Sequence, residues 1–239
     1  ENPLKEDVLV IDLGNDFRLE SDFQSRNFIY GLPELHKNKL KSAKSIANPG
    51  CFATAIQLAL LPLAKEKLLA AIYTTGITGA TGAGQSLSST THFSWRNDNI
   101  SAYKSLNHQH VDEVLKTLNQ SNEEKIDLHF VPWRGDFARG IFTSSIIKCD
   151  LDLNEIQKIF QTFYKDAVFV TISEKPIDMK QVINTNRCAI HIEKNKDTIV
   201  VHSAIDNLLK GASGQAVQNM NIAMDWEENT GLQLKPTAF

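Results

Sequence analysis

The stretch "NPGCFATAIQLALLPL" places Cys51 at the predicted start of a long apolar helix. Asn48, Pro49 and Gly50 stand before it as helix-start signals. A thiol in that position lies at the positive end of the helix dipole and beside unpaired backbone N–H groups, and both favour the thiolate. Gly50 also removes side-chain bulk beside the sulfur. The pattern makes Cys51 a candidate nucleophile, with a buried structural cysteine as the alternative.

A second group of candidates comes from "NHQHVDEV", where His108, His110 and Glu113 gather at the entrance of a predicted helix. Imidazole is the side chain best suited to proton transfer near neutral pH, and a nearby carboxylate can orient it and support its charge. We therefore interpret the two histidines as candidate acid–base groups for Cys51, with non-catalytic histidines as the alternative. A zinc site would need further ligands at suitable spacing, and because none is evident we predict no metal.

Two further features could bind a ligand. Arg18 follows a predicted strand into a loop, where its guanidinium could bind a carboxylate or phosphate through paired hydrogen bonds; a surface arginine is the alternative. The glycines of "GITGATGAGQ" match neither the dinucleotide-binding nor the P-loop spacing. They suit a loop that substrate or cofactor approaches closely.

The bulk composition excludes several classes of partner. The 239-residue chain has a net charge of −3 with both signs mixed, which gives no field favouring nucleic acid or an anionic membrane. No apolar run reaches the roughly 18 to 20 residues that cross a bilayer, and the amino terminus lacks the order of a signal peptide. Three cysteines at irregular spacing fit neither a disulfide framework nor a metal motif. We expect a cytoplasmic protein with reduced thiols.

Apolar patterns predict where the elements lie. Strands are expected at 8–13, 71–75, 126–133, 140–151 and 167–174, followed by a hairpin over 188–206. Helices are expected over 51–62, 108–120, 153–167 with Asn154 as a possible cap, and 212–224. Interleaved strands and helices beside a hairpin favour an α/β or α+β fold with a mixed sheet.

Seven sequence blocks then occur in a recognisable order. They are "VIDLGNDFRL", "YGLPEL", "ANPGCFATAIQLAL", "GITGATGAG", "NHQHVDEV", "ARGIFTS" and "KGASGQAVQNMN". Together they resemble the signature stretches of the N-acetyl-gamma-glutamyl-phosphate reductase family, from Val8 to Gly231. The resemblance implies an arginine-biosynthesis enzyme that reduces an acyl phosphate to the semialdehyde with NADPH and releases phosphate. It also implies a covalent thioester on Cys51.

The resemblance carries expectations about architecture. It implies a partial Rossmann-type dinucleotide-binding domain, at 1–50 and 208–239, and an α+β catalytic and dimerisation domain at 51–207. The catalytic domain would have a mixed sheet, as in glyceraldehyde-phosphate dehydrogenase. A homo-oligomer, dimer or tetramer, with a small-molecule substrate is expected.

The resemblance also assigns roles to individual residues. His108 and His110 would transfer the proton, with Glu113 oriented toward them; His108 is preferred, although the family retains both. Arg18, Tyr103 and Arg139 would hold the substrate. The implied NADP(H) contacts are Thr78, Gly79, Gly82, Lys210, Gly211, Gln215 and Asn219.

Several positions depart from the family pattern. Gln85 stands where the family usually has arginine, and Ala53 and Asp112 replace usual prolines. The family's amino-terminal glycine-rich segment, which binds the pyrophosphate of NADP, is not found in this sequence. We therefore expect this polypeptide alone to bind NADPH poorly. Arg134, close to Arg139, could match a succinyl group in place of acetyl; a surface arginine is the alternative.

Other functions are also considered. Aspartate-semialdehyde dehydrogenase would share the cysteine and the closing helix, but not "YGLPEL" or "NHQHVDEV". A Cys-His acyltransferase or hydrolase would need no nicotinamide. A catalytically inactive interaction module would not require the intact cysteine and histidines.

Overall fold

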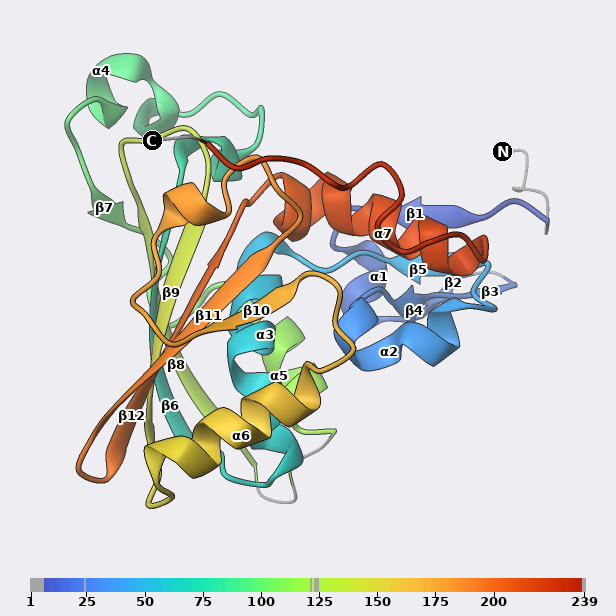
Figure 1. The fold of residues 1–239 in the computed structure, drawn as a ribbon. Coiled ribbons are helices and arrows are strands. Elements are labelled where there is room, and N and C mark those ends of the chain that lie inside the picture. Colours follow the sequence, from blue (N-terminus) through green and yellow to red (C-terminus); the bar gives the residue numbers. More distant parts are fainter. Residues whose placement is uncertain (1–6, 24, 121, 123–124, 238–239) are drawn as a thin grey trace.

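A mixed sheet is the largest element of the computed structural model, which describes residues 7–23, 25–120, 122 and 125–237. Its seven strands run in the order β10-β11-β12-β9-β6-β8-β7 (Figure 1). The pairs β6–β8 and β10–β11 are parallel and the others antiparallel. The bounds are β6 Ala71–Thr78, β7 Ser101–Ala102, β8 Asp127–Arg134, β9 Ile141–Lys148, β10 Val170–Ser173, β11 Cys188–Asn195 and β12 Thr198–Ile205. The predicted mixed sheet is confirmed.

Three helices cover one face of this sheet (Figure 1): α3 (Cys51–Lys65), α5 (His110–Leu118) and α6 (Leu153–Phe163). Side chains alternate between the two faces along each strand. Ile72 and Ile147 are buried in the core, whereas their neighbours Tyr73 and Ile146 are 55% and 44% exposed. One face of the sheet is therefore packed, whereas the other is open around Tyr73 and Ile146 and is covered at β11 and β12, where Ala189 and Ala204 pack with Ile177 and Val182.

The helix that begins at Cys51 runs through Pro62 to Lys65. A proline inside a helix leaves the carbonyl four residues earlier without its backbone N–H donor. Here that carbonyl belongs to Leu58, and the Tyr164 hydroxyl donates to it at 2.6 Å. The predicted end at Pro62 is therefore wrong, because a side chain from the end of α6 satisfies the freed carbonyl.

A smaller body is built from the first part of the described chain and the helix α7, and the chain beyond α7 returns to the larger body, where the Thr237 N–H donates to the Ile183 carbonyl (Figure 1). Its three strands pair in the parallel order β1-β5-β4. The helix α7 packs against α2. The bounds are β1 Val10–Asp12, α1 Asp16–Leu19, β2 Asp22–Phe23, β3 Arg26–Asn27, β4 Ile29–Tyr30, α2 Pro33–Leu40, β5 Ser45–Ala47 and α7 Gly214–Ala223. The division into 1–50 with 208–239 and 51–207 stays a prediction, and residues 1–6, 24, 121, 123–124 and 238–239 of it lie outside the described residues.

The predicted start of α6 at Leu153 is confirmed, but its predicted cap is wrong. Asp152, not Asn154, caps α6, because the Asp152 side chain accepts from the third residue of the helix and its N–H donates to Glu155. The last helix begins at Gly214, after a π-helical turn over Leu209–Ser213. A short helix α4 (Phe93–Arg96) lies in the long connection from β6 to β7.

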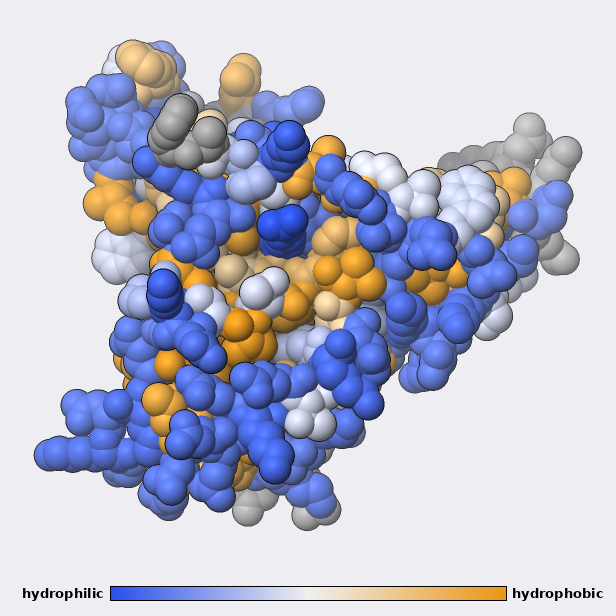
Figure 2. All heavy atoms as spheres, in the orientation of Figure 1, coloured by the Kyte–Doolittle hydropathy of each residue, from blue (hydrophilic) through white to orange (hydrophobic). Residues whose placement is uncertain are grey.

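The surface on the side shown in Figure 2 is mostly hydrophilic, with apolar residues grouped in the hollow between the two bodies. Among the described helices, none has the length and apolar character needed to span a membrane.

Candidate active site

Cys51 is the first residue of α3, and two glycines let other parts of the chain approach it closely. A Cβ on Gly50 would overlap Nε2 of His110 and lie 2.8 Å from Nη1 of Arg18. A Cβ on Gly211 would lie 2.8 Å from Cβ of Cys51. Gly50 is therefore required for the imidazole and the guanidinium to lie against the helix entrance, as its small size suggested.

The cysteine lines a cavity of about 230 Å³ at the carboxyl ends of β6 and β8. The lining residues are Cys51, Phe52, Thr78, Gly82, Ala83, Tyr103, Lys104, His108, Gln109, His110 and Arg134. The structure thus brings together the candidate nucleophile, both candidate acid–base histidines and three of the predicted ligand-binding residues.

Burial controls the ionisation of the thiol. It raises the pKa of Cys51 to about 11, although the backbone N–H of Phe52 and the charge of Arg18 act in the opposite direction. The negative charge of Glu113 raises the pKa further. The lowering influences expected at a helix start are present, but burial outweighs them, and the expected thiolate is replaced by a neutral thiol. Cys51 therefore needs a proton acceptor beside it.

The two histidines are neutral bases in this cavity. Burial and nearby cations lower the pKa of His108 to about 4, and burial and the neighbouring His108 lower that of His110 to about 3. Their ring centroids lie 4.7 Å apart. The backbone N–H of His110 donates to Nδ1 of His108 at 3.2 Å, so the neutral His108 ring carries its proton on Nε2. His108 is thereby set up as a hydrogen-bond donor through Nε2.

Glu113 lies beside His110 and at the centre of a buried hydrogen-bond network. Oε1 accepts from the Tyr30 hydroxyl at 2.7 Å and from the Gly50 N–H at 2.9 Å. Oε2 lies 3.5 Å from Nη1 of Arg18 and 4.0 Å from Nε2 of His110. Burial raises the pKa of Glu113, while Arg18, Gly50 and Tyr30 oppose that rise. The carboxylate is thus placed to support a charge on His110.

Arg18 is buried, which excludes the alternative of a surface arginine. Its Nε donates to the Asn48 carbonyl at 2.9 Å and its Nη2 to the Leu13 carbonyl at 3.0 Å. Nη1 donates to Asn15 and faces Glu113. The guanidinium therefore fixes the loops around the helix entrance and supplies positive charge to the thiol. Its contact with substrate stays a prediction.

Arg134, rather than Arg139, lies in the cavity. Its guanidinium stacks 4.6 Å from the centre of the Tyr103 ring, and its buried Nε has no partner within the described chain. Burial raises the pKa of Tyr103 to about 12. Arg139 is not among the lining residues and donates instead to buried Asp206 at 3.0 Å. The alternation of side chains along β8 could have predicted this position. Arg134 lies on the same face of the strand as the buried residues Leu128, Phe130 and Pro132.

Two predicted cofactor contacts, Thr78 and Gly82, lie in the cavity wall. Gly79 does not, because it packs against Ala138 and donates its N–H to the Gly140 carbonyl. Gly211 packs against Cys51 and leaves no room for a side chain there.

The other three predicted cofactor contacts are completely buried at the junction with α7. Nζ of Lys210 donates to Glu34 at 2.7 Å and to Gln218 at 2.9 Å. The amide nitrogens of Gln215 and Asn219 donate to protein oxygens, whereas their carbonyl oxygens are buried acceptors without a donor in the described residues. Lys210 is thus already paired, but the two amide oxygens could still accept a hydrogen bond.

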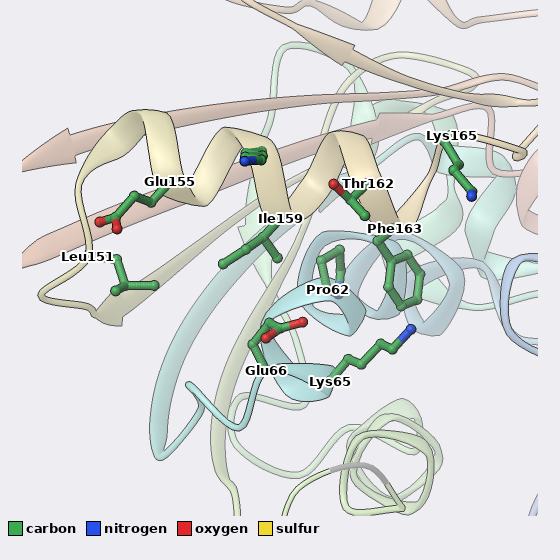
Figure 3. Close-up of a pocket in the computed structure, with 10 residues that line it drawn as sticks. Pro62, Lys65, Glu66, Leu151, Glu155, Ile159, Thr162, Phe163 and Lys165 are labelled. Carbon is green, nitrogen blue, oxygen red and sulfur yellow. The ribbon is translucent and has the colours of Figure 1, made fainter.

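A larger cavity of about 580 Å³ lies at the far end of α3, away from the chemistry (Figure 3). Its wall includes Pro62 and Lys65 of α3 and Ile159 and Phe163 of α6, and none of the predicted site residues. No cluster of three or more histidine, cysteine or acidic residues that could hold a metal occurs in the described part of the chain.

Comparison with solved structures identifies the fold, and a family model identifies the class. Aspartate semialdehyde dehydrogenase II from Vibrio cholerae superposes with a TM-score of 0.72 over 91% of this chain and 73% of that chain, at 16% identity. A probable aspartate-semialdehyde dehydrogenase from Pseudomonas aeruginosa gives 0.66 over 90% and 72%, at 12% identity. The family described as "Semialdehyde dehydrogenase, dimerisation domain" matches residues 51–207. The chain therefore has the semialdehyde dehydrogenase fold and is an oxidoreductase of that class.

More similar sequences specify the family. N-acetyl-gamma-glutamyl-phosphate reductase from Phocaeicola vulgatus is 53% identical over 98% of this chain and 73% of its own length. The proteins of the same name from Bacteroides thetaiotaomicron and Flavobacterium johnsoniae are 52% and 51% identical, over 98% and 100% of this chain and 73% and 75% of their own lengths. The chain belongs to the N-acetyl-gamma-glutamyl-phosphate reductase family, which confirms the resemblance. The aspartate-semialdehyde alternative is supported at the level of fold alone.

Proposed function

We propose that this protein reduces an N-acyl-gamma-glutamyl phosphate to the N-acyl-glutamate semialdehyde and releases phosphate, in arginine biosynthesis. The observation that carries the proposal is the shared cavity, in which Cys51 at the start of α3 meets His108, His110 and Arg134. The name of its relatives, at about half identity, supports the same reaction. The family membership and this constellation together favour a reductase over a Cys-His hydrolase.

The first step is acylation of Cys51. The sulfur attacks the carbonyl carbon of the acyl phosphate, the bond from that carbon to the phosphate oxygen breaks, and a thioester remains. The thiol proton passes to the neutral imidazole of His110, because His108 already carries its proton on Nε2, and Glu113 stabilises the resulting imidazolium. Arg134, which lines the cavity, supplies positive charge for the phosphate.

The second step is reduction of the thioester. A nicotinamide cofactor, which we propose to be NADPH, supplies the hydride when bound. Nε2–H of His108 donates to the substrate oxygen as negative charge develops there, and the thiolate of Cys51 leaves when the aldehyde forms.

The residues present fit a nicotinamide group in part. Thr78 and Gly82 would contact it from the cavity wall, whereas the carbonyl oxygens of Gln215 and Asn219 are completely buried and do not line that cavity. Lys210 does not fit this role, because its ammonium is already paired with Glu34.

We further propose a cytoplasmic homo-oligomer. The family description assigns a dimerisation domain to 51–207. The open face of the seven-stranded sheet exposes Tyr73 and Ile146, and the nearby connection exposes Leu87 and Phe93. Large apolar groups of this kind favour contact with a second copy. Sedimentation of the wild type and Ile146→Lys tests this surface, with loss of the oligomer expected.

The function is tested by the acylation half-reaction without nicotinamide. N-acetyl-gamma-glutamyl phosphate should release one phosphate per chain and leave an N-acetylglutamyl mass increment on Cys51. Cys51→Ser should show neither, whereas Cys149→Ser, which changes a buried cysteine outside the cavity, should behave as the wild type. Repeated phosphate release without an adduct would instead support a hydrolase, and no release would contradict the proposal.

A further inference from the structure

A tyrosine outside the cavity is directly connected to the candidate chemistry. Tyr30 ends β4 in the smaller body and does not line the Cys51 cavity. Its hydroxyl donates to Oε1 of Glu113 at 2.7 Å and accepts from Nε2 of Gln57 at 2.7 Å. Gln57 lies on α3, the helix that begins at Cys51. The hydroxyl therefore joins three elements through two short hydrogen bonds.

The direction of these bonds is fixed by chemistry. An ionised carboxylate can only accept, so the hydroxyl hydrogen of Tyr30 points to Glu113. The hydroxyl oxygen then accepts the amide N–H of Gln57. Both side chains are held in one orientation, and Gln57 is completely buried. A bond to an ionised group is stronger than one between neutral groups.

The groups that face Glu113 come from four elements. Arg18 comes from α1, Tyr30 from β4, Cys51 from α3 and His110 from its own helix α5. Arg18, the Gly50 N–H and the Tyr30 hydroxyl favour the ionised carboxylate, whereas burial disfavours it. The charge on Glu113 thus depends on a small number of contacts. One of them, the hydroxyl, can be removed without changing the shape of the ring.

We propose that Tyr30 is a positioning residue, whose hydroxyl, oriented by Gln57, holds the ionised carboxylate of Glu113 against His110 and Arg18 at the base of the Cys51 cavity. The proposal rests on the proposed function, because its first test measures the rate of the proposed acylation of Cys51. Tyr30 acts through Glu113 and does not itself touch the reacting atoms.

Tyr30→Phe tests the proposal through the pH profile of Cys51 acylation. Loss of the donor raises the pKa of Glu113, so the acid limb of the acylation rate should move to higher pH by about one unit. The KM for the acyl phosphate should change less than about twofold, because no substrate contact is lost. An unchanged acid limb would overturn the proposal.

The matched control is Tyr164→Phe. Tyr164 is also buried, and its hydroxyl donates to the Leu58 carbonyl of α3 without contacting Glu113. This variant should lose stability without moving the acid limb, and an equal shift in both variants would contradict a specific role for Tyr30. Gln57→Leu, which leaves the hydroxyl in place, should shift the limb in the same direction by a smaller amount. It keeps the test decisive if Tyr30→Phe does not fold.

A second readout separates this proposal from the reaction itself. The carboxyl carbon of Glu113 can be followed by carbon NMR during a pH titration and assigned with Glu113→Gln. Its midpoint should be higher in Tyr30→Phe than in the wild type. If the wild type releases no phosphate at any pH, the proposed function fails, while this titration still supports or overturns the role of Tyr30.

Discussion

The backbone N–H of Gly50 donates to Oε1 of Glu113 at 2.9 Å. This bond ties the entrance of α3 to α5, and so joins the residue before the candidate nucleophile to the residue that supports the histidines. Because Gly50 has no side chain, α5 can approach the entrance of α3; a Cβ on Gly50 would overlap the His110 ring. The helix start and the acid–base group therefore form one structural unit.

Gly50→Ala should disrupt this unit. The added methyl group must displace His110 or Arg18, and overpacking of this kind costs about 1–3 kcal/mol. We expect lower stability in urea unfolding and a fall in the acylation rate of at least about tenfold. Gly231→Ala is a suitable control, because a Cβ there meets nothing within 4 Å, and only its left-handed backbone is strained. Wild-type acylation by Gly50→Ala would contradict this account of the site.

The raised pKa of Cys51 predicts that its alkylation becomes fast only at high pH. A thiol with a pKa of about 11 should react with iodoacetamide ever faster as the pH rises through that value. An unperturbed cysteine has its midpoint near 8.5. Intact mass after short exposures measures the rate, with Cys51→Ser reporting any reaction at Cys149 and Cys188. A midpoint at or below that of free cysteine would show that the helix start outweighs burial.

The lowered pKa values of His108 and His110 predict that the protein loses stability in acid. Both have a pKa below the ordinary value because they are buried, so the unfolded chain takes up more protons as the pH falls below about 6.5. Their contribution is complete above that pH and is lost toward the folded values of about 4 and about 3. His110→Gln should flatten the dependence in urea unfolding. Parallel curves for the wild type and this variant would refute the linkage.

Substitution of Arg134 and of Arg139 should have different effects on the KM for the acyl phosphate. Arg134 lines the cavity, so Arg134→Gln should raise the KM for the acyl phosphate about tenfold or more through loss of a charge-assisted contact. Arg139→Gln should mainly change stability, because Arg139 pairs with Asp206. Similar KM values for both variants would contradict the assignment.

The same arginine allows a test of the acyl group. If Arg134 binds a second carboxylate, the succinylated substrate should turn over faster than the acetylated one, and Arg134→Gln should remove the difference. Equal or better turnover of the acetylated substrate would exclude the succinyl hypothesis. Turnover of both substrates by the wild type and the variant provides the comparison.

Lys210 offers a test between a cofactor contact and a structural ion pair. Lys210→Met leaves Glu34 buried without its cation and should destabilise the protein by about 3–5 kcal/mol. Adding Glu34→Leu should recover part of that loss in chemical unfolding. A stable Lys210→Met variant with weaker NADPH binding would instead support the cofactor role.

The sequence predicted the sheet, the helix at Cys51 and the position of the two histidines, because apolar period and cap residues are local signals. It could not predict that α3 continues past Pro62, since the Tyr164 hydroxyl that satisfies Leu58 comes from a distant segment. The Asn154 cap failed for a smaller reason, because Asp152 and Glu155 form a better matched pair.

The site shows the same division between local and distant effects. A helix start suggested a thiolate at Cys51, but the thiol pKa is set by burial under segments that the local pattern does not reveal. The motif placed Arg139 with the substrate, whereas the inward phase of β8 directs Arg134 to the cavity. Lys210 belongs to the same signature block as Gln215, and only its partner Glu34 shows that its charge is already neutralised.

Gly211 forms the wall against Cys51, although it lies far along the chain from that residue. During synthesis from the amino terminus, α3 and both histidines leave the ribosome before this wall exists. The wall beside Cys51 is therefore completed only after the π-helical turn Leu209–Ser213 has been synthesised. Contacts between such distant positions also slow folding. The nascent chain would thus hold its candidate nucleophile and both histidines before the site around them is complete.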